Sequence, residues 1–137
     1  MAERDAAGEV RAAADALVEA FAAHDPAAYF ASFAPEASFV FYTAAERLPD
    51  RSAYERLWAK WEREDGFRVH GCTTTDADIR VFGDVAVLAH DVETDVELGG
   101  TRETVHERET IVFERREGRW LAVHEHLSPR PEEEGNG

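Results

Sequence analysis

The sequence predicts an α+β domain in which helices come first and an antiparallel sheet follows. Three observations support this prediction. Apolar residues recur at helical spacing in the first half, extended β-rich segments fill the chain after Gly66, and turn residues ("GD", "GG" and "REG") separate those segments. Helices followed by consecutive strands are typical of a fold in which the helices pack on one face of a curved sheet.

Three helices are predicted in the first half of the chain. The first covers about residues 3–24, where Ala, Glu and Arg predominate. The second follows "HDP", because Asp25 is a good N-cap and Pro26 suits the first helical position. The third opens near Asp50 or Ser52. Its apolar stripe consists of Tyr54, Leu57, Trp58 and Trp61.

One strand is predicted before the third helix and four strands after it. They cover about residues 37–42, 67–82, 85–97, 101–115 and 119–127. We expect residues 1–128 to form a single domain, since no repeat or second domain is visible. The polar end of the chain, residues 129–137, is predicted to be an acidic disordered tail.

The composition disfavours several classes of function. The net charge of −14 repels phosphate backbones and anionic membranes, so we expect neither nucleic-acid nor membrane binding. A single cysteine, Cys72, allows no internal disulfide and no cysteine-rich zinc motif. The charged N-terminus does not resemble a secretory signal, and no stretch approaches transmembrane length. These features predict a cytoplasmic protein.

Two loop lengths are possible in the last hairpin. If "EG" is the loop, Arg116 faces Arg119. If "REG" forms a three-residue loop, Arg115 faces Arg119, and further along Glu109 faces Glu125. We favour the three-residue loop, because it keeps each face of the sheet chemically coherent.

The preceding turn, "GG", also allows a loop of two residues or three. With three, Asp91 lies beside Glu109, and His90 lies on the opposite face. One face then ends in a row of three carboxylates, Asp91, Glu109 and Glu125. The other face carries His90, His106, Arg108, Thr110, Trp120, His124 and His126.

Three segments carry a resemblance to a known family: "HDPAAYFASFAPEASFVFY", "YERLWAKW" and "RETIVFERREGRWLAVHEHLSP". The last contains Arg-x-Thr at residues 108–110, then Gly118 and Trp120, and His-x-His-x-Ser at residues 124–128. Over about residues 17–129 the chain resembles the SnoaL-like branch of the nuclear transport factor 2-like superfamily. This branch includes the association domain of calmodulin-dependent kinase II.

The resemblance implies a cone-shaped fold, with three N-terminal helices on the concave face of a strongly bent, mostly antiparallel sheet. It also implies a pocket between these layers and a homodimer formed through the convex face. Positions 91, 111 and 127 and Trp58 are implied to look inward. The three strand positions are arginines in the kinase domain, whereas this chain has Asp91, Ile111 and Leu127. We therefore expect an acidic pocket.

The carboxylate row is the candidate catalytic group. Neighbouring strands lie about 5 Å apart, so three acids cannot all ionise easily in a partly apolar pocket. In the catalytic interpretation Asp91 or Glu109 is a general base, and Glu125 donates a proton or orients its partner. Alternatively, the acids are solvated at the pocket rim, are paired with Arg68 or Arg80, or bind a basic ligand.

Apolar side chains are expected to form the ligand-binding wall. The predicted contacts are Phe41, Tyr54, Trp58, Ile111 and Leu127. Alternatively, these aromatics are simply core, as is more common for aromatics at helical spacing. The expected ligand is a small hydrophobic or cationic molecule, and no cofactor is expected.

The polar residues of the opposite face are the candidate dimer interface. They are His90, Arg108, Thr110, His124 and His126. Their imidazole and hydroxyl groups can satisfy one another between two subunits. A metal site is the alternative, since neutral imidazole suits several transition metals. The cation of Arg108 among the histidines disfavours it, so we expect no metal.

These observations predict a small-molecule-binding, SnoaL-like protein. One hypothesis is an acid–base enzyme that needs no cofactor: an isomerase, cyclase of the polyketide type, dehydratase or hydrolase. The alternative is a non-catalytic ligand-binding or oligomerisation module. One fold hosts many chemistries, so the fold does not decide between them.

Overall fold

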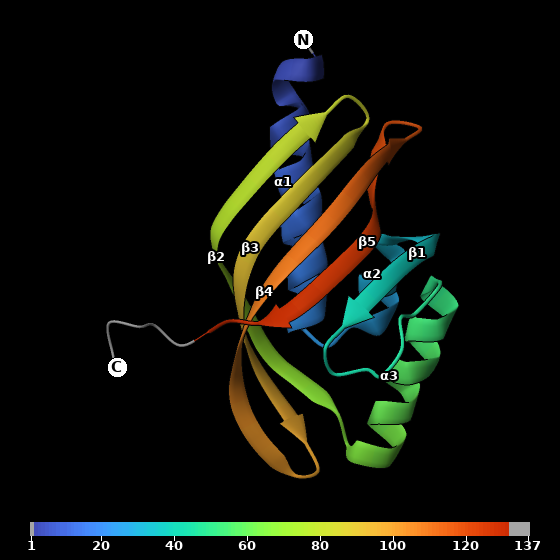
Figure 1. Cartoon of the computed structure of the whole chain (residues 1–137), viewed down its shortest axis with the longest axis vertical. Coiled ribbons are helices and arrows are strands. Elements are labelled where there is room, and N and C mark those ends of the chain that lie inside the picture. Colours follow the sequence, from blue (N-terminus) through green and yellow to red (C-terminus); the bar gives the residue numbers. More distant parts are fainter. Residues whose placement is uncertain (1, 132–137) are drawn as a thin grey trace.

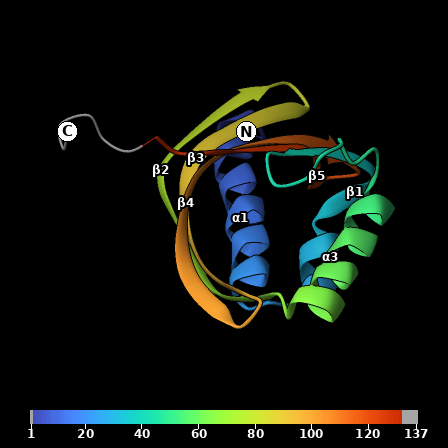
Figure 2. The ribbon, with the colours of Figure 1, turned by 60° about the horizontal axis from the view of Figure 1, so that its bottom comes forward.

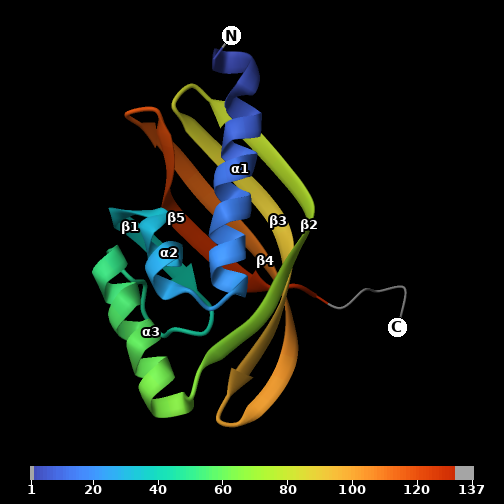
Figure 3. The same ribbon diagram turned by 180° about the vertical axis from the view of Figure 1, so that it is seen from behind.

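Three helices lie on one face of a five-stranded sheet, as Figures 1 and 3 show. The computed structural model describes residues 2–131, with side chains from residue 5 onward. The elements are α1 (Ala2–Ala22), α2 (Pro26–Ala31), β1 (Phe33–Phe41), α3 (Arg51–Asp65), β2 (Arg68–Phe82), β3 (Val85–Leu98), β4 (Thr101–Arg116) and β5 (Arg119–Pro129). The predicted α+β class and order of elements are confirmed.

The second and third helices begin where their capping residues predict. The Ala28 N–H donates to Asp25 Oδ1 over 3.2 Å, and the Ala53 N–H donates to Asp50 Oδ1 over 2.9 Å. Each bond satisfies an amide that the helix itself leaves without a partner. Gly66 ends α3 in the left-handed conformation, with φ 61°. Local chemistry therefore sets these boundaries.

The sheet is mixed and strongly bent. Its order is β1-β5-β4-β3-β2, with β1 parallel to β5 and the other neighbouring pairs antiparallel. Figure 2 shows β2, β3 and β4 curving around α1. This curvature produces the concave side that the helices cover, in agreement with the expected cone-shaped fold.

The β4–β5 loop contains two residues, so the predicted three-residue loop is wrong. Arg116 pairs with Arg119. The two loop residues, Glu117 and Gly118, both have left-handed backbones, with φ 52° and 77°. Two consecutive left-handed residues are the pattern of a type I′ turn, whose twist matches that of antiparallel strands. The match of twist outweighs the steric cost of a left-handed Glu117.

A β-bulge restores the expected alternation further along β5. Before the bulge Ala122 pairs with Phe113, and after it Glu125 pairs with Ile111, so Val123 has no partner across the ladder. One extra residue exchanges the two faces of the strand. Glu125 therefore points toward the helices, as predicted, although the register that led to this prediction is wrong.

The β3–β4 loop also contains two residues rather than three. Gly99 and Gly100 both adopt left-handed conformations, with φ 59° and 81°, and this shorter loop shifts the register by one residue. A shift of one residue moves every side chain of the strand to the opposite face. His90 consequently faces inward and Asp91 faces outward, which reverses both predictions.

The core fills the space between the helices and the concave side of the sheet. Trp58 is 2% exposed, and its ring packs against Phe21, Tyr29 and Phe67. Trp120, which we predicted on the outer face, precedes the bulge and is buried. In residues 2–131 we find no helix with the length and apolar character needed to cross a membrane.

The predicted acidic tail, residues 129–137, lies mostly outside the described residues. Pro129 is the last residue of β5, and residues 132–137 are not described. Arg130, just beyond the strand, donates its backbone N–H to the carbonyl of His106 over 3.1 Å. The ordered contacts of the chain thus extend slightly past the predicted end of the domain.

Candidate active site

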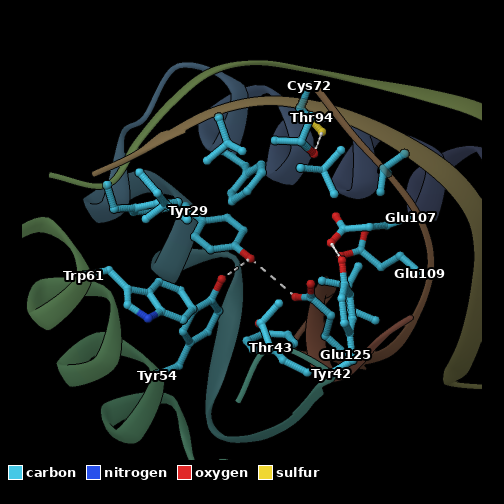
Figure 4. A pocket seen from close by; sticks show the side chains of 18 of the residues that line it. Tyr29, Tyr42, Thr43, Tyr54, Trp61, Cys72, Thr94, Glu107, Glu109 and Glu125 are labelled. Atoms are coloured by element: carbon cyan, nitrogen blue, oxygen red, sulfur yellow. Dashed lines mark hydrogen bonds between the residues drawn. The ribbon is translucent and has the colours of Figure 1, made fainter. Parts of the chain in front are cut away.

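A cavity of about 360 Å³ lies between the helices and the concave side of the sheet (Figure 4). This volume suits a small molecule. Its wall is mainly apolar, and the aromatic part includes Phe21, Tyr29, Phe41, Tyr54, Trp61 and Phe67. The charged side chains that line it are Asp65, Glu103, Glu107, Glu109 and Glu125, all of them acidic.

Two of these carboxyls, Glu109 on β4 and Glu125 on β5, are neighbours and shift each other's pKa. Glu125 is only 3% exposed. Burial, and then the charge of Glu109, raise the pKa of Glu125 well above its ordinary value. Burial alone would also raise the pKa of Glu109, but hydrogen bonds with Glu125 and His90 hold it below its ordinary value. Of the two carboxyls, Glu125 therefore holds a proton more firmly than Glu109.

His90 lies directly behind Glu109 and fixes its carboxylate. The Nε2 atom of His90 donates to Glu109 Oε1 over 2.7 Å, and the imidazole is fully buried. The other ring nitrogen, Nδ1, has no hydrogen-bond partner within residues 5–131. The hydrogen bonding of this imidazole is thus directed to Glu109. This bond favours the ionised form of the Glu109 carboxyl.

Two tyrosine hydroxyls adjoin the carboxyl pair from the helical side. Tyr29 on α2 donates to Glu125 Oε1 over 3.4 Å, and the hydroxyls of Tyr29 and Tyr54 are 3.1 Å apart. Figure 4 shows these hydroxyls and the carboxyl of Glu125 pointing toward one another. Burial raises the pKa of both phenols well above its ordinary value, so both remain protonated donors at neutral pH.

Glu107 adds a third carboxyl on the same side of β4. It is 9% exposed, and it accepts a hydrogen bond of 2.5 Å from the hydroxyl of Tyr42. Burial raises the pKa of Glu107, while the bond from Tyr42 opposes this rise. We did not predict Glu107 in the site, although it shares the face of Glu109 because residues two apart on a strand point the same way.

The family model of the SnoaL-like domain matches residues 10–131, which is most of the chain. The chain belongs to this SnoaL-like family. Among curated proteins, none matches it.

Solved structures share the fold of this SnoaL-like protein. An NTF2-like protein of unknown function from Pseudomonas putida KT2440 is 19% identical, with a TM-score of 0.76, over 98% of this chain and 93% of the other. An NTF2-like protein from Cytophaga hutchinsonii is 15% identical, with a TM-score of 0.77, over 95% and 100%. A CamKII hub homology domain from Chlamydamonas reinhardtii is 24% identical, with a TM-score of 0.71, over 92% and 98%.

Three of the five predicted wall residues of the SnoaL-like pocket line the cavity: Phe41, Tyr54 and Leu127. Trp58 and Ile111 do not; they are 2% and 0% exposed and belong to the core behind the wall. The prediction that they form part of the wall is wrong, because nearer side chains cover them. Phe21 and Tyr29, for example, pack on the ring of Trp58 and line the cavity themselves.

Asp91 does not join the other two predicted catalytic carboxylates. It lies on the outer face of β3, where Arg108 Nε is 3.6 Å from Oδ1 and Arg130 Nη1 is 3.5 Å from Oδ2. Its predicted place in the pocket is wrong because the β3–β4 loop is one residue shorter than expected. The alternative that Arg80 neutralises the pocket acids does not hold, since Arg80 pairs with Asp78 over 3.0 Å.

Four of the five predicted interface residues lie on the outer face of the sheet: Arg108, Thr110, His124 and His126. His90 is the exception, because it lies behind Glu109. The side chains of His124 and Ser38 share a hydrogen bond of 2.9 Å. Burial and then the nearby His126 lower the pKa of His124. Across the described part of the chain, no group of three or more His, Cys, Asp or Glu residues has an arrangement suited to a metal ion.

Proposed function

We propose that this SnoaL-like protein binds a small, largely apolar molecule in the cavity and catalyses proton transfer on it without a cofactor. The observation that carries the proposal is the pair of Glu109 and Glu125 at the cavity wall, where burial raises the pKa of Glu125 and hydrogen bonding lowers that of Glu109. A base and an acid side by side suit the isomerisation, cyclisation, dehydration or hydrolysis of a carbonyl compound.

The two carboxyls have complementary roles in this proposal. Glu109, kept ionised by His90, takes a proton from the carbon next to a carbonyl group. Negative charge then develops on the carbonyl oxygen. Glu125 donates its proton there, and the hydroxyls of Tyr29 and Tyr54 add hydrogen-bond donors beside it. An isomerisation is completed when Glu109 returns its proton to another carbon of the same molecule and the enol oxygen gives its proton back to Glu125.

A deuterium-exchange experiment tests this proton transfer. The protein is incubated in D₂O with a panel of apolar cyclic ketones, among them 2-tetralone, and deuterium incorporation beside the carbonyl is followed by ¹H NMR. Glu109→Gln should slow the exchange by about 10²–10⁴-fold, the usual contribution of a general base. Glu46→Gln, at an exposed loop position, should leave the rate unchanged. Exchange no faster than in buffer for all the ketones, or equal rates for wild type and Glu109→Gln, contradicts the proposal.

We also propose that two copies associate through the outer face of the sheet. The likeness to a hub homology domain supports self-association. The outer face is also partly apolar, because half-buried side chains lie among its histidines: Val40, Val87, Val112 and Leu121. An apolar patch with a polar rim is typical of an interaction surface. This second role does not involve the cavity, so each proposal is tested separately.

A further inference from the structure

We infer that the ligand of this cavity is an amphiphilic cation, in which an ammonium group is attached to an apolar body and lies against Glu107. This inference rests on the proposed function, because it concerns the same cavity. The first support is the sign of the lining charges: the charged residues of the described wall are all acidic. An anionic ligand would be repelled, whereas a cation supplies the missing counter-charge.

The second support is how the chain distributes its own cations. Several carboxylates on the outer surface are paired with arginine, such as Asp95 with Arg102 over 2.8 Å and Asp84 with Arg115 over 2.6 Å. Glu107, by contrast, is in no ion pair with any residue in the range 5–131, and its hydrogen-bond partner there is a neutral phenol. A buried carboxylate without a cation is unfavourable until a ligand provides one.

The third support is the aromatic wall opposite the acids. Figure 4 shows Glu107 and Glu109 on one side of the cavity, with Trp61 and Tyr54 on the other. Aromatic faces attract cations through their quadrupole, most strongly where water is excluded. A ligand with an ammonium group and an apolar body therefore finds favourable partners on both walls. A neutral ligand gains only from the aromatic side.

The position of the acids indicates how such a ligand enters. Asp65 at the end of α3 and Glu103 on β4 are exposed, whereas Glu107, further along β4, is buried. Exposed carboxylates at the rim attract a cation over a distance of about 10 Å at ordinary salt. Glu107 then provides a more strongly interacting site, because burial reduces screening. The pair of Glu109 and Glu125 remains free for chemistry.

A pair of isosteric probes tests the inference. Benzyltrimethylammonium and neopentylbenzene have nearly the same shape, but only the first is charged. Binding to the full chain at pH 7 is followed by quenching of tryptophan fluorescence, to which Trp61 in the wall contributes. We expect the ammonium probe to bind at least tenfold more tightly. Glu107→Gln should remove most of this preference and leave the affinity for neopentylbenzene unchanged.

The matched control is Glu93→Gln, which removes the same charge from an exposed position on the outer face and should keep the preference. Circular dichroism checks that each variant is folded. If Glu107→Gln does not fold, Glu103→Gln at the rim replaces it, with a reduced preference expected. Equal or tighter binding of neopentylbenzene to the wild type overturns the inference but leaves the cavity proposal intact. Failure of both probes to bind also overturns the inference, whereas the deuterium-exchange rates decide the proposed function independently.

Discussion

Glu125→Gln should change how the stability of the protein depends on pH. In the folded state Glu125 keeps its proton to a higher pH, because burial and the charge of Glu109 raise its pKa above the ordinary value of 4.5. In the unfolded chain this carboxyl is exposed and loses its proton above that value. Between the two values, the folded state therefore binds one more proton than the unfolded state.

The sign and size of the effect follow from this difference. A state that binds more protons becomes less stable, relative to its partner, as the pH rises. The free energy of unfolding should thus fall with rising pH, by up to about 1.4 kcal/mol per pH unit for one proton. Carboxyls with lowered pKa values, such as Asp95 and Glu62, have the opposite effect, but they are common to both proteins and cancel in the comparison.

Urea unfolding from pH 5 to pH 8 measures this difference. In Glu125→Gln the amide carries no titrating proton and can still donate to Glu109. The stability of the wild type relative to this variant should therefore decrease as the pH rises, until the raised pKa is passed. Glu46→Gln, at an exposed position, should run parallel to the wild type. Parallel curves for the wild type and Glu125→Gln would refute the idea that the pKa of Glu125 is raised in the folded state.

Three further changes test other parts of the structure. Glu117→Asn should raise the free energy of unfolding by up to about 1 kcal/mol in urea titrations, because Asn tolerates φ 52° better than Glu; a loss of stability contradicts this. Asp50→Ala should lower it by about 1 kcal/mol, since α3 loses its N-cap, and an unchanged midpoint counts against that role. Val112→Glu should yield a monomer in sedimentation velocity, whereas exposed Lys60→Glu should not; equal masses argue against the proposed interface.

Features that depend on neighbouring residues could be predicted from the sequence. Asp25 and Asp50 mark helix starts because an N-cap carboxylate satisfies amides two or three residues away. Gly66 marks a helix end because its left-handed conformation favours glycine. The strands were also predicted to within a few residues, since alternation and turn residues are local properties.

The faces of the strands could not be predicted as securely, because they depend on loop length. Gly99 and Gly100 can sit in a loop of two residues or three, although a Gly-Gly pair favours the two-residue type I′ turn that forms. Glu117 is harder still, since a left-handed glutamate has a steric cost that only the strand pairing offsets. An error of one residue in the β3–β4 register exchanged the predicted sheet faces of His90 and Asp91. In the β4–β5 register, the bulge at Val123 cancelled a similar error of one residue, so that Glu125 still faces the helices.

The alternation of β4 links the two proposals for the cavity. Glu107 and Glu109 point to the same side, and residues two apart on a strand are separated by about 7 Å. An ammonium group held at Glu107 therefore places the rest of the ligand beside the carboxyls of Glu109 and Glu125. A molecule that satisfies both sites needs its carbonyl group about 7 Å from its nitrogen. In a series of amino ketones with increasing spacer length, the rate of deuterium exchange should be highest when the carbonyl group and the nitrogen are separated by this distance. A rate independent of spacer length would show that binding at Glu107 does not position the carbonyl group for proton transfer.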